Sequence, residues 1–376
     1  MLLILLVISL LFWCIILLLP WRPWSTKESF DRCNGHIPLS SLDTLTVLIP
    51  ARNEAPQLGK ILPSILSQGT GITVLVVDDC SDDETAEVAT KILDSQGVVI
   101  KGKPLQEGWV GKLWALEQGL KHVKTKYILL MDADIVLERG ILSSVLSFME
   151  KKDIDFFSLM AWLNMEYFLE RLFMPAFVYF FKLLYPFKLA NKKGNFVAAA
   201  AGGFILTKTE ILKNIGAFST LKGSIIDDCT LAQKVKDRGY TTFVGLTKCV
   251  KSIRKYQNLA TIWHMVERTA YTQLLYNPFL LILATFLLVT CFIVPTVGLF
   301  SCNLLTLVIS LTTLFIMYIS YVPVLRYYDL NPLIGVTLPF VASLYLAMTW
   351  SSAVRYYLGV GAAWKGRKYI NKSKDK

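Results

Sequence analysis

The sequence lacks the cysteine spacing of a metal site or a disulfide framework. Its seven cysteines are scattered through 376 residues, and none forms a C-x-x-C pair. Structural zinc sites and disulfide-rich folds usually carry closely spaced cysteines. The pattern therefore disfavours both and is typical of a protein in a reducing compartment.

The sequence also lacks a recognisable nucleic-acid-reading module, although its net charge is +11, from 39 basic and 28 acidic residues. Much of the basic excess borders apolar segments. It comprises Arg22, Lys27 and Arg32 after the first segment, and Lys365, Arg367, Lys368, Lys372, Lys374 and Lys376 in the tail. Basic residues at such borders fit anionic headgroups and the positive-inside rule. We expect a lipid bilayer as partner and no nucleic acid.

Long apolar runs are what the sequence has in excess. The hydrophobic fraction is 54% and the mean hydropathy is +0.48, which is too high for a purely soluble protein. Residues 1–19, 278–300, 304–325 and 332–354 each approach the roughly 20 residues that a spanning helix needs. The first run has neither a basic start nor a small-residue cleavage site, which favours a retained anchor over a removed signal peptide.

These runs divide the chain into five expected regions. They are a membrane anchor at 1–20, a basic linker at 21–42, a soluble domain at 43–275, C-terminal membrane helices at 276–356 and a basic tail at 357–376. The first basic cluster places the domain in the cytoplasm. Three full spans after the domain would put the basic tail outside, against its charge. We therefore expect two or three C-terminal spans. With two, one apolar run is re-entrant or lies in the interface, and the pattern leaves open which one.

The central region alternates strand-like and helix-like segments. Strands are predicted over 45–51, 72–77 and 127–131, with helices after the first strand, over 82–95 and over 112–123. This alternation predicts an α/β domain whose mostly parallel sheet is covered on both faces. In such sheets ligands bind beyond the carboxyl ends of the strands.

Four carboxylates follow two of these strands directly: Asp78 and Asp79 after one, Asp132 and Asp134 after another. Ionised carboxylates are costly to bury unless they are paired or bound to a cation. Asp132 and Asp134 are one residue apart, so both can reach a single ion. Their oxygens suit Mg²⁺ or Mn²⁺, and Mg²⁺ usually lies between protein carboxylates and substrate phosphates. We predict a divalent cation here.

The second half of the region is less regular. Residues 156–191 are rich in aromatic and aliphatic residues and have few charges. Two core helices, or a helix lying in the membrane interface, would both explain this composition. Residues 227–238 predict a helix with Leu231 and Val235 on one face and Gly239 as its stop.

Four ordered motifs, spread over about residues 43–275, resemble those of the family 2 inverting glycosyltransferases, which adopt the nucleotide-sugar-binding GT-A fold. The motifs are TVLIPARNEA (46–55), VLVVDDCSDDET (74–85), MDADI (131–135) and IIDDCTLAQKVKDRGY (225–240). The first is similar to the family's opening strand and nucleotide loop, the second to its nucleoside-binding aspartates and the third to its D-x-D metal motif. The fourth is similar to its general-base element, with Asp227 in place of the usual Glu.

Further stretches resemble the hopene-associated branch, whose members are membrane glycosyltransferases linked with hopanoid lipids. They are EGWVGKLWAL (107–116), AAAAGGFILTKTEIL (198–212), IWHMVERTAYTQLLYNP (262–278) and WKGRKY (364–369). Ceramide glucosyltransferases are more distant relatives. The Q-x-x-R-W motif of processive members survives here only as Arg268, which disfavours a polymerase.

The resemblance implies a set of site residues. Asp228 would be the general base beside Asp227, and Asp132 and Asp134 would hold the metal. The donor would contact Pro50, Ala51, Arg52, Glu54, Asp78, Asp79, Lys112, Asp132 and Arg268, and Gly202 and Gly203 would line the acceptor side. The implied reaction moves a sugar from a nucleotide diphosphate donor, a UDP-sugar, to a membrane lipid. The implied location is the bacterial inner membrane, with the catalytic domain in the cytoplasm.

Other interpretations exist. Asp78 and Asp79 could cap a turn, and Lys112 is either a solvated lysine at a helix start or a diphosphate contact. A transporter or flippase with a nucleotide-sugar-binding regulatory domain is a second class, but transport pathways usually contain ionisable residues, and these apolar runs contain almost none. A nucleotidyltransferase would usually show a Gly-rich basic loop after the first strand, where this sequence has none. A donor-binding pseudoenzyme would not need the complete aspartate set.

Overall fold

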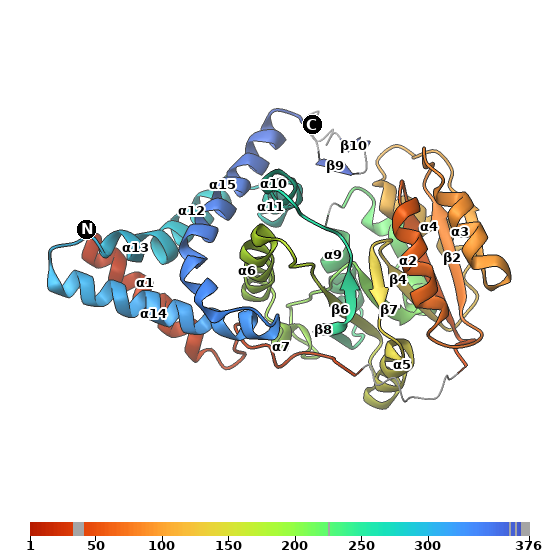
Figure 1. The fold of residues 1–376 in the computed structure, drawn as a ribbon, viewed down its shortest axis with the longest axis horizontal. Helices are drawn as coiled ribbons and strands as arrows, with labels where there is room; N and C mark the ends of the chain where they lie inside the picture. The colour runs from red at the N-terminus through yellow and green to blue at the C-terminus, as the bar shows by residue number, and fades with distance from the viewer. Residues whose placement is uncertain (33–40, 225, 361, 365–366, 370–376) are drawn as a thin grey trace.

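The computed structural model describes residues 1–32, 41–224, 226–360, 362–364 and 367–369. Figure 1 shows an α/β domain at one end and, at the other, helices from both ends of the chain. Residues 33–40 of the expected linker and most of the expected basic tail lie outside the described residues.

An eight-stranded sheet forms the centre of the α/β domain, in the order β3-β2-β1-β4-β7-β6-β8-β5. Its strands are β1 (Leu45–Ala51), β2 (Thr73–Asp78), β3 (Gly97–Lys101), β4 (Tyr127–Met131), β5 (Ile135–Leu137), β6 (Phe156–Trp162), β7 (Phe204–Lys208) and β8 (Thr242–Ser252). The pairs β3–β2, β2–β1 and β1–β4 are parallel, as the strand–helix alternation predicted. Beyond β4 the sheet is mixed, because β7 runs antiparallel to both β4 and β6, and β5 antiparallel to β8.

Helices cover both faces of this sheet. They are α2 (Ala55–Leu66), α3 (Thr85–Leu93) and α5 (Ile141–Lys152) on one face, and α4 (Gly111–Leu120), α8 (Thr209–Asn214) and α9 (Asp227–Asp237) on the other, with short turns η1 (Asp94–Gln96) and η2 (Ala217–Leu221). Successive residues of a strand point to opposite faces. Accordingly, Val47 and Ile49 of β1 pack with α2, whereas Leu48 packs with α4.

The segment 156–191 does not begin as a helix. It starts with strand β6, followed by α6 (Phe168–Leu184) and α7 (Phe187–Ala190). The expectation of helix from residue 156 is therefore wrong for β6. The first six residues of this strand are buried, and a strand buried on both faces gives a continuous apolar run that periodicity cannot distinguish from a buried helix.

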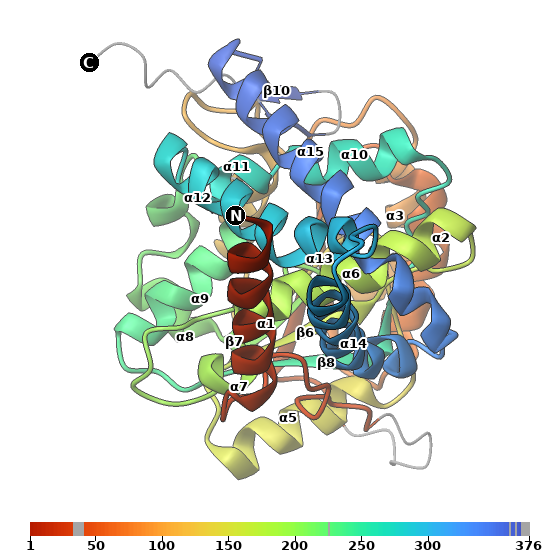
Figure 2. The same cartoon turned by 90° about the vertical axis from the view of Figure 1, so that its left-hand side faces the viewer.

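The helices outside the domain are apolar. They are α1 (Leu2–Leu18), α12 (Pro278–Leu288), the π-helical η3 (Val289–Ile293), α13 (Val294–Gly298), α14 (Leu304–Tyr327), η4 (Pro332–Thr337) and α15 (Leu338–Tyr357). Among the described residues, three continuous helices are long and apolar enough to cross a membrane: Pro278–Gly298, Leu304–Tyr327 and Pro332–Tyr357. In Figure 2, α1, α13 and α14 lie side by side in front of the domain.

Two short helices, α10 (Leu259–Glu267) and α11 (Ala270–Gln273), connect the domain to α12. A hairpin of β9 (Ala362–Trp364) and β10 (Arg367–Tyr369) follows α15. α6, α10, α14 and α15 share one hydrophobic cluster, which includes Phe173, Ile262, Met317 and Tyr345. The apolar helices and the second half of the domain are thus packed as one unit.

The cysteines are mostly free thiols, as the scattered spacing predicted: Cys14, Cys80, Cys229, Cys291 and Cys302. Cys249 is disulfide-bonded. Sequence spacing gave no signal for this bond, because a disulfide needs two side chains that the fold, not the sequence, brings together.

Candidate active site

The turn between β4 and β5 carries Asp132 and Asp134 to the carboxyl edge of the sheet. The Asp132 N–H donates to the Gly203 carbonyl at 3.3 Å, and the Asp134 carbonyl accepts the Ile253 N–H at 2.9 Å. Backbone bonds to two other segments therefore fix the turn. Both aspartate side chains line a cavity of about 310 Å³.

The walls of this cavity come from many parts of the chain. One set of lining side chains is charged: Glu54, Lys112, Asp132, Asp134, Asp227, Asp228, Arg254 and Arg268. Another set is apolar and comes from β6, α6 and α10 and the loop after β6: Met160, Leu163, Phe177, Phe181 and Met265. The cavity can therefore hold a molecule with a highly charged part and an apolar part.

Lys112, at the start of α4, is the central cation. Its Nζ lies 2.7 Å from Asp132 Oδ1 and 3.9 Å from Asp227 Oδ2. Burial alone would lower the pKa of this lysine, but the charges of Asp132 and Asp227 outweigh burial and raise the pKa above its ordinary value. Lys112 therefore stays protonated. It joins the turn after β4 to the start of α9.

Arg254, just after β8, plays the corresponding part for the second carboxylate of the turn. Its Nε lies 2.8 Å from Asp134 Oδ2, and its Nη2 lies 3.8 Å from Glu54 Oε1. Burial and the nearby Asp132 charge raise the pKa of Asp134, against the opposing effect of Arg254. The sequence reading missed Arg254. A cation directly after a strand could have drawn attention to it, but β8 itself had not been predicted.

Asp228, in the first turn of α9, is held by two backbone donors. The Gly202 N–H donates to Oδ2 at 2.9 Å, and the Cys229 N–H donates to Oδ1 at 2.7 Å. Burial and the adjacent Asp227 charge nevertheless raise the pKa of Asp228 from 3.8 to about 6. A carboxylate with a pKa near neutrality, fixed in orientation and lining a cavity, is suited to accept a proton.

Gly202 permits these contacts because it has no side chain. A Cβ at this position would lie 3.1 Å from Lys112 Nζ and 3.3 Å from Asp228 Oδ2. At Gly203 a Cβ would lie 3.1 Å from Ile135 Cδ1. Both glycines line the cavity, where they had been expected on the acceptor side.

Several predicted donor contacts lie in the neighbouring loops. Pro50 and Glu54 line the cavity, but Arg52 points to the turn after β2, where its Nη1 donates to the Asp79 carbonyl at 2.7 Å. The Asp79 side chain is fully buried, and Asp78 Oδ1 accepts the Ser81 N–H at 3.2 Å. Ala51 is also buried, and its carbonyl accepts the Asp79 N–H at 2.8 Å. These four residues bind the end of β1 to the turn after β2, and none of them lines the cavity.

The carboxylates of the site suit a metal ion whose remaining ligands come from the substrate. Within the part of the chain that the structure describes, no cluster of three or more His, Cys, Asp or Glu side chains is arranged for a metal. Asp132 and Asp134 supply two carboxylates, each facing a cationic side chain. Two carboxylates fit Mg²⁺ or Mn²⁺ when waters and substrate phosphates supply the other ligands.

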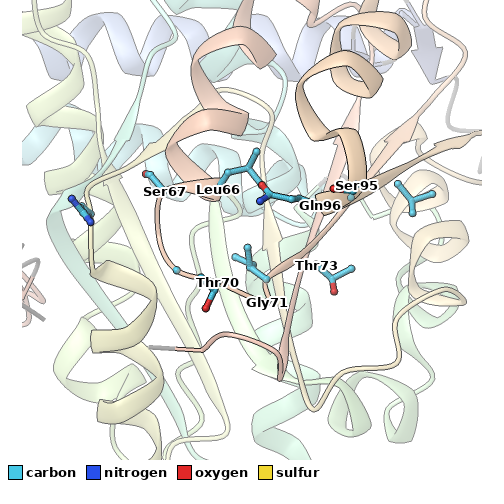
Figure 3. A pocket seen from close by; sticks show the side chains of 12 residues that line it. Leu66, Ser67, Thr70, Gly71, Thr73, Ser95 and Gln96 are labelled. Carbon is cyan, nitrogen blue, oxygen red and sulfur yellow. The ribbon is translucent and has the colours of Figure 1, made fainter. Parts of the chain in front are cut away.

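A larger cavity, of about 710 Å³, lies at the opposite edge of the sheet. Figure 3 shows Thr73 at the start of β2, Gln96 just before β3, and Ser67 and Thr70 around this cavity. It lies at the amino ends of parallel strands, whereas ligands of such sheets bind at the carboxyl ends. The cavity around Asp132 is therefore the candidate active site.

Comparison with known proteins identifies the class of the α/β domain. Residues 46–216 match Glycosyl transferase family 2. This glycosyl transferase family 2 region contains Pro50, Lys112, Asp132 and Asp134, and it ends before Asp228. The prediction of a family 2 glycosyltransferase domain is confirmed over these residues.

Curated relatives are similar over a short region. A 4,4'-diaponeurosporenoate glycosyltransferase of Staphylococcus aureus (strain bovine RF122 / ET3-1) is 40% identical over 96 residues, which are 26% of this chain and 25% of that protein. The protein of the same name from strain USA300 is 40% identical over 95 residues, 25% of each chain. The chain thus spans about a quarter of the length of the curated relatives it matches.

A solved structure covers much more of the chain. The mannosyltransferase PcManGT from Pyrobaculum calidifontis, in complex with GDP-Man and Mn²⁺, is 16% identical, with 93% of this chain and 98% of that chain covered at a TM-score of 0.54. At this identity the likeness shows the fold. It confirms the expected GT-A-like α/β architecture with apolar helices at both ends of the chain.

Proposed function

We propose that this chain is a membrane-bound inverting glycosyltransferase that moves a sugar from a nucleotide diphosphate donor, a UDP-sugar, to a lipid acceptor. The observation that carries the proposal is the convergence of Asp132, Asp134 and Asp228 on one cavity whose other lining is apolar. The family 2 region supports the reaction class. A relative named for diaponeurosporenoate supports a lipid-type acceptor.

The donor would lie across the carboxyl ends of β1, β2 and β4. We assign the nucleoside to the loops after β1 and β2, because Ala51 pairs with Asp78 in the sheet and Pro50 and Glu54, at the end of β1, line the cavity. The diphosphate would lie between Lys112 and Arg268, which can compensate its negative charge. A divalent cation held by Asp132 and Asp134 would neutralise charge on the departing diphosphate.

Asp228 would act as the general base. Each of its oxygens already accepts one backbone N–H, and each retains a lone pair for a further hydrogen bond. The acceptor hydroxyl gives its proton to Asp228 while its oxygen attacks the anomeric carbon. The bond from that carbon to the diphosphate oxygen breaks as the new bond forms, so the product has the opposite anomeric configuration.

The acceptor would enter along the apolar lining. Phe177 and Phe181 come from α6 and Met265 from α10, and both helices pack against α15. A lipid whose hydroxyl reaches Asp228 would rest its apolar part against these side chains. The resemblance to the hopene-associated branch extends the proposal to hopanoid-linked lipids. We also propose that residues 43–275 are the cytoplasmic catalytic domain of a multi-pass protein in a bacterial inner membrane.

Product analysis tests the proposal. The chain is purified in detergent, incubated with a panel of nucleotide sugars, lipid extract and Mg²⁺ or Mn²⁺, and assayed for nucleoside diphosphate and glycolipid by mass spectrometry. We expect nucleoside diphosphate to be released only when both lipid and divalent ion are present. Replacing Asp228 by Asn should lower kcat by about 10²–10⁴-fold with donor binding retained.

The matched control is Asp237→Asn, the same substitution at the exposed end of the same helix, which should leave turnover unchanged. Full turnover in Asp228→Asn would remove the general base from the proposal. Nucleoside diphosphate release that is independent of lipid would remove the acceptor class.

A further inference from the structure

α15 is long and apolar enough to cross a membrane, but its surroundings indicate another position. We propose that α15 lies in the plane of the cytoplasmic membrane surface, with one apolar side turned to the lipid, while α1, α12–α13 and α14 cross the bilayer. The partner of that apolar side is the boundary between headgroups and acyl chains. This inference rests on membrane association and is independent of the reaction proposed above.

The N-terminal end of α15 lies beside the domain. α14 ends at Tyr327, and a short turn leads into η4 and α15. In that turn, Asp329 Oδ2 lies 2.8 Å from Nζ of Lys248 on β8. The turn is thereby bound to a strand of the central sheet.

The C-terminal end of α15 also lies beside the domain. Arg355 Nε lies 3.4 Å from Oε2 of Glu267 on α10, and Ser351 donates to the same carboxylate. The N–H of Tyr271 on α11 donates to Ser352 Oγ at 3.1 Å. α11 directly precedes α12, so this end of α15 lies where the chain leaves the domain for the membrane helices.

Both ends of α15 therefore lie beside the domain, at the domain end of the helices that extend away from it. The helix Pro278–Gly298 and α14 are joined by the short segment 299–303 and pack together through α13, so they form an antiparallel pair that leaves the domain and returns to it. The first part of that helix, α12 and η3, packs against α15. Between its ends, α15 is bound to α6, because Tyr345 Oη donates to the Phe173 carbonyl at 2.9 Å. Figure 1 shows α15 crossing the base of this pair and running along the domain.

The side of α15 that faces away from the protein is apolar. Phe340 and Val354 are 60% and 50% exposed, and they lie about four turns apart on one side of the helix. Trp350 borders α12, where its Nε1 donates to Thr285 Oγ1 at 3.0 Å. Val341 and Met348 are buried against the protein. An exposed apolar helix face marks an interaction surface.

The distribution of charge agrees with this arrangement. If α1, α12–α13 and α14 each cross the membrane, residue 1 lies outside the cell and the domain lies in the cytoplasm. Segment 299–303, between α13 and α14, then lies outside, and it has no Lys or Arg. If α15 stays on the cytoplasmic surface, the basic residues after position 360 are also inside, as the positive-inside rule requires. If α15 crossed, they would be outside. With α15 in the plane of the membrane, only three of the four apolar runs cross, and the basic tail is in the cytoplasm.

Depth measurements by spin labelling test the proposal. Single cysteines replace Phe340, Ala347 or Val354 in the full chain, with the exposed Cys302 changed to serine and the signal of the parent protein subtracted. After reconstitution into phospholipid vesicles, accessibility to oxygen and to a water-soluble nickel reagent gives the depth of each label. Positions 340 and 354 are about 21 Å apart along the helix axis, from about 1.5 Å per residue.

An in-plane helix predicts the same shallow depth at all three positions. A spanning helix would place residue 347 about 10 Å deeper than the other two, and that result would overturn the proposal. Leu304→Cys and Phe315→Cys on α14 are the matched controls, and the second should be much deeper than the first. The readout needs no turnover, so failure of the proposed reaction would not affect it.

A second measurement uses the C-terminus. A fusion to green fluorescent protein should fluoresce, and a fusion to alkaline phosphatase should be inactive, because both reporters would be in the cytoplasm. Active phosphatase with a dark fluorescent fusion would place the tail outside and overturn the proposal.

Discussion

The two aspartate pairs, at the ends of β2 and β4, look alike in sequence and differ in the structure. Asp132 and Asp134 line the cavity, and each faces a cationic side chain, Lys112 or Arg254. Asp78 and Asp79 instead hold the turn after β2, where Asp79 is fully buried. A position at a strand end therefore predicts the edge of the sheet on which a carboxylate lies, but not whether its side chain lines the cavity.

Spacing explains part of this difference. Asp132 and Asp134 are separated by one residue in a tight turn, so both side chains can face the same space. Asp78 and Asp79 are adjacent, and the left-handed conformation of Cys80, with φ of +53°, turns the chain sharply after them. If this comparison is correct, the cavity pair should act on catalysis and the turn pair mainly on the shape of the loop.

The largest expected effect separates the two pairs. Asp132→Asn removes a charge that faces the cavity, and should lower kcat/KM by about 10²–10³-fold, the range for losing one electrostatic contact in an active site. Asp78→Asn keeps a side-chain oxygen for the Ser81 N–H and should act mainly through KM, by about tenfold or less. Steady-state kinetics of the two variants, with melting temperatures to check folding, measure this. Equal losses in kcat would contradict the comparison.

Arg254 should have the next largest effect. Arg254→Ala leaves Asp134 and Glu54 without their cation, and should lower divalent-ion affinity or activity by about 10–100-fold, as is typical for residues that orient metal ligands. The neighbouring Lys255→Ala removes an exposed pair with Glu166 and should change little, because exposed ion pairs contribute little. Titration of both variants with the divalent ion measures its affinity for each of them. Similar metal affinities would show that Arg254 does not orient Asp134.

The pH profile should report on Asp228. Burial and the Asp227 charge raise the pKa of Asp228 to about 6, and a general base works only when ionised. Thus kcat/KM should be constant above neutral pH and fall about tenfold per unit below pH 6. Asp227→Asn removes a like charge, lowers the pKa of Asp228 and should move the inflection to lower pH. An inflection that does not move in this variant would contradict the assignment.

The smallest effect is expected at Gly202. Gly202→Ala places a Cβ 3.1 Å from Lys112 Nζ and 3.3 Å from Asp228 Oδ2, so both side chains must shift by a few tenths of an ångström. Misplacement on this scale should lower kcat by roughly tenfold or less. Gly59→Ala, in α2 where a Cβ meets nothing within 4 Å, should leave kcat unchanged. Wild-type kcat in Gly202→Ala would show that close approach at residue 202 is unimportant.

The sequence could predict the local half of this architecture. Apolar runs that end in Asp or Pro-Ala-Arg predict β1, β2 and β4. Because the strands are expected to be parallel, their carboxyl ends are expected at the same edge of the sheet. The sequence could not predict β6, because periodicity cannot distinguish its continuous apolar run from a buried helix. It could not predict β8, because residues 242–252 mix apolar, polar and charged side chains without a clear strand pattern. Arg254 was missed for the same reason, since it follows β8.

Hydropathy also could not distinguish the position of α15 from that of α14. Both are apolar and of spanning length, and only the contacts of Tyr345 and Arg355 with the domain show that α15 runs along its surface. The charge of the tail favours an arrangement in which one run does not cross. It could not indicate which one, because charge constrains only the number of crossings.

The central claim is that one cavity gathers the donor diphosphate, the carboxylates and the base. An electron cryomicroscopy map of the full chain with UDP and Mn²⁺ tests it most directly. The account predicts diphosphate density within contact of Asp132, Asp134 and Lys112, with Asp228 facing the open side of the β-phosphate. Nucleotide density in the cavity of Figure 3, between the amino ends of β2 and β3, would contradict it.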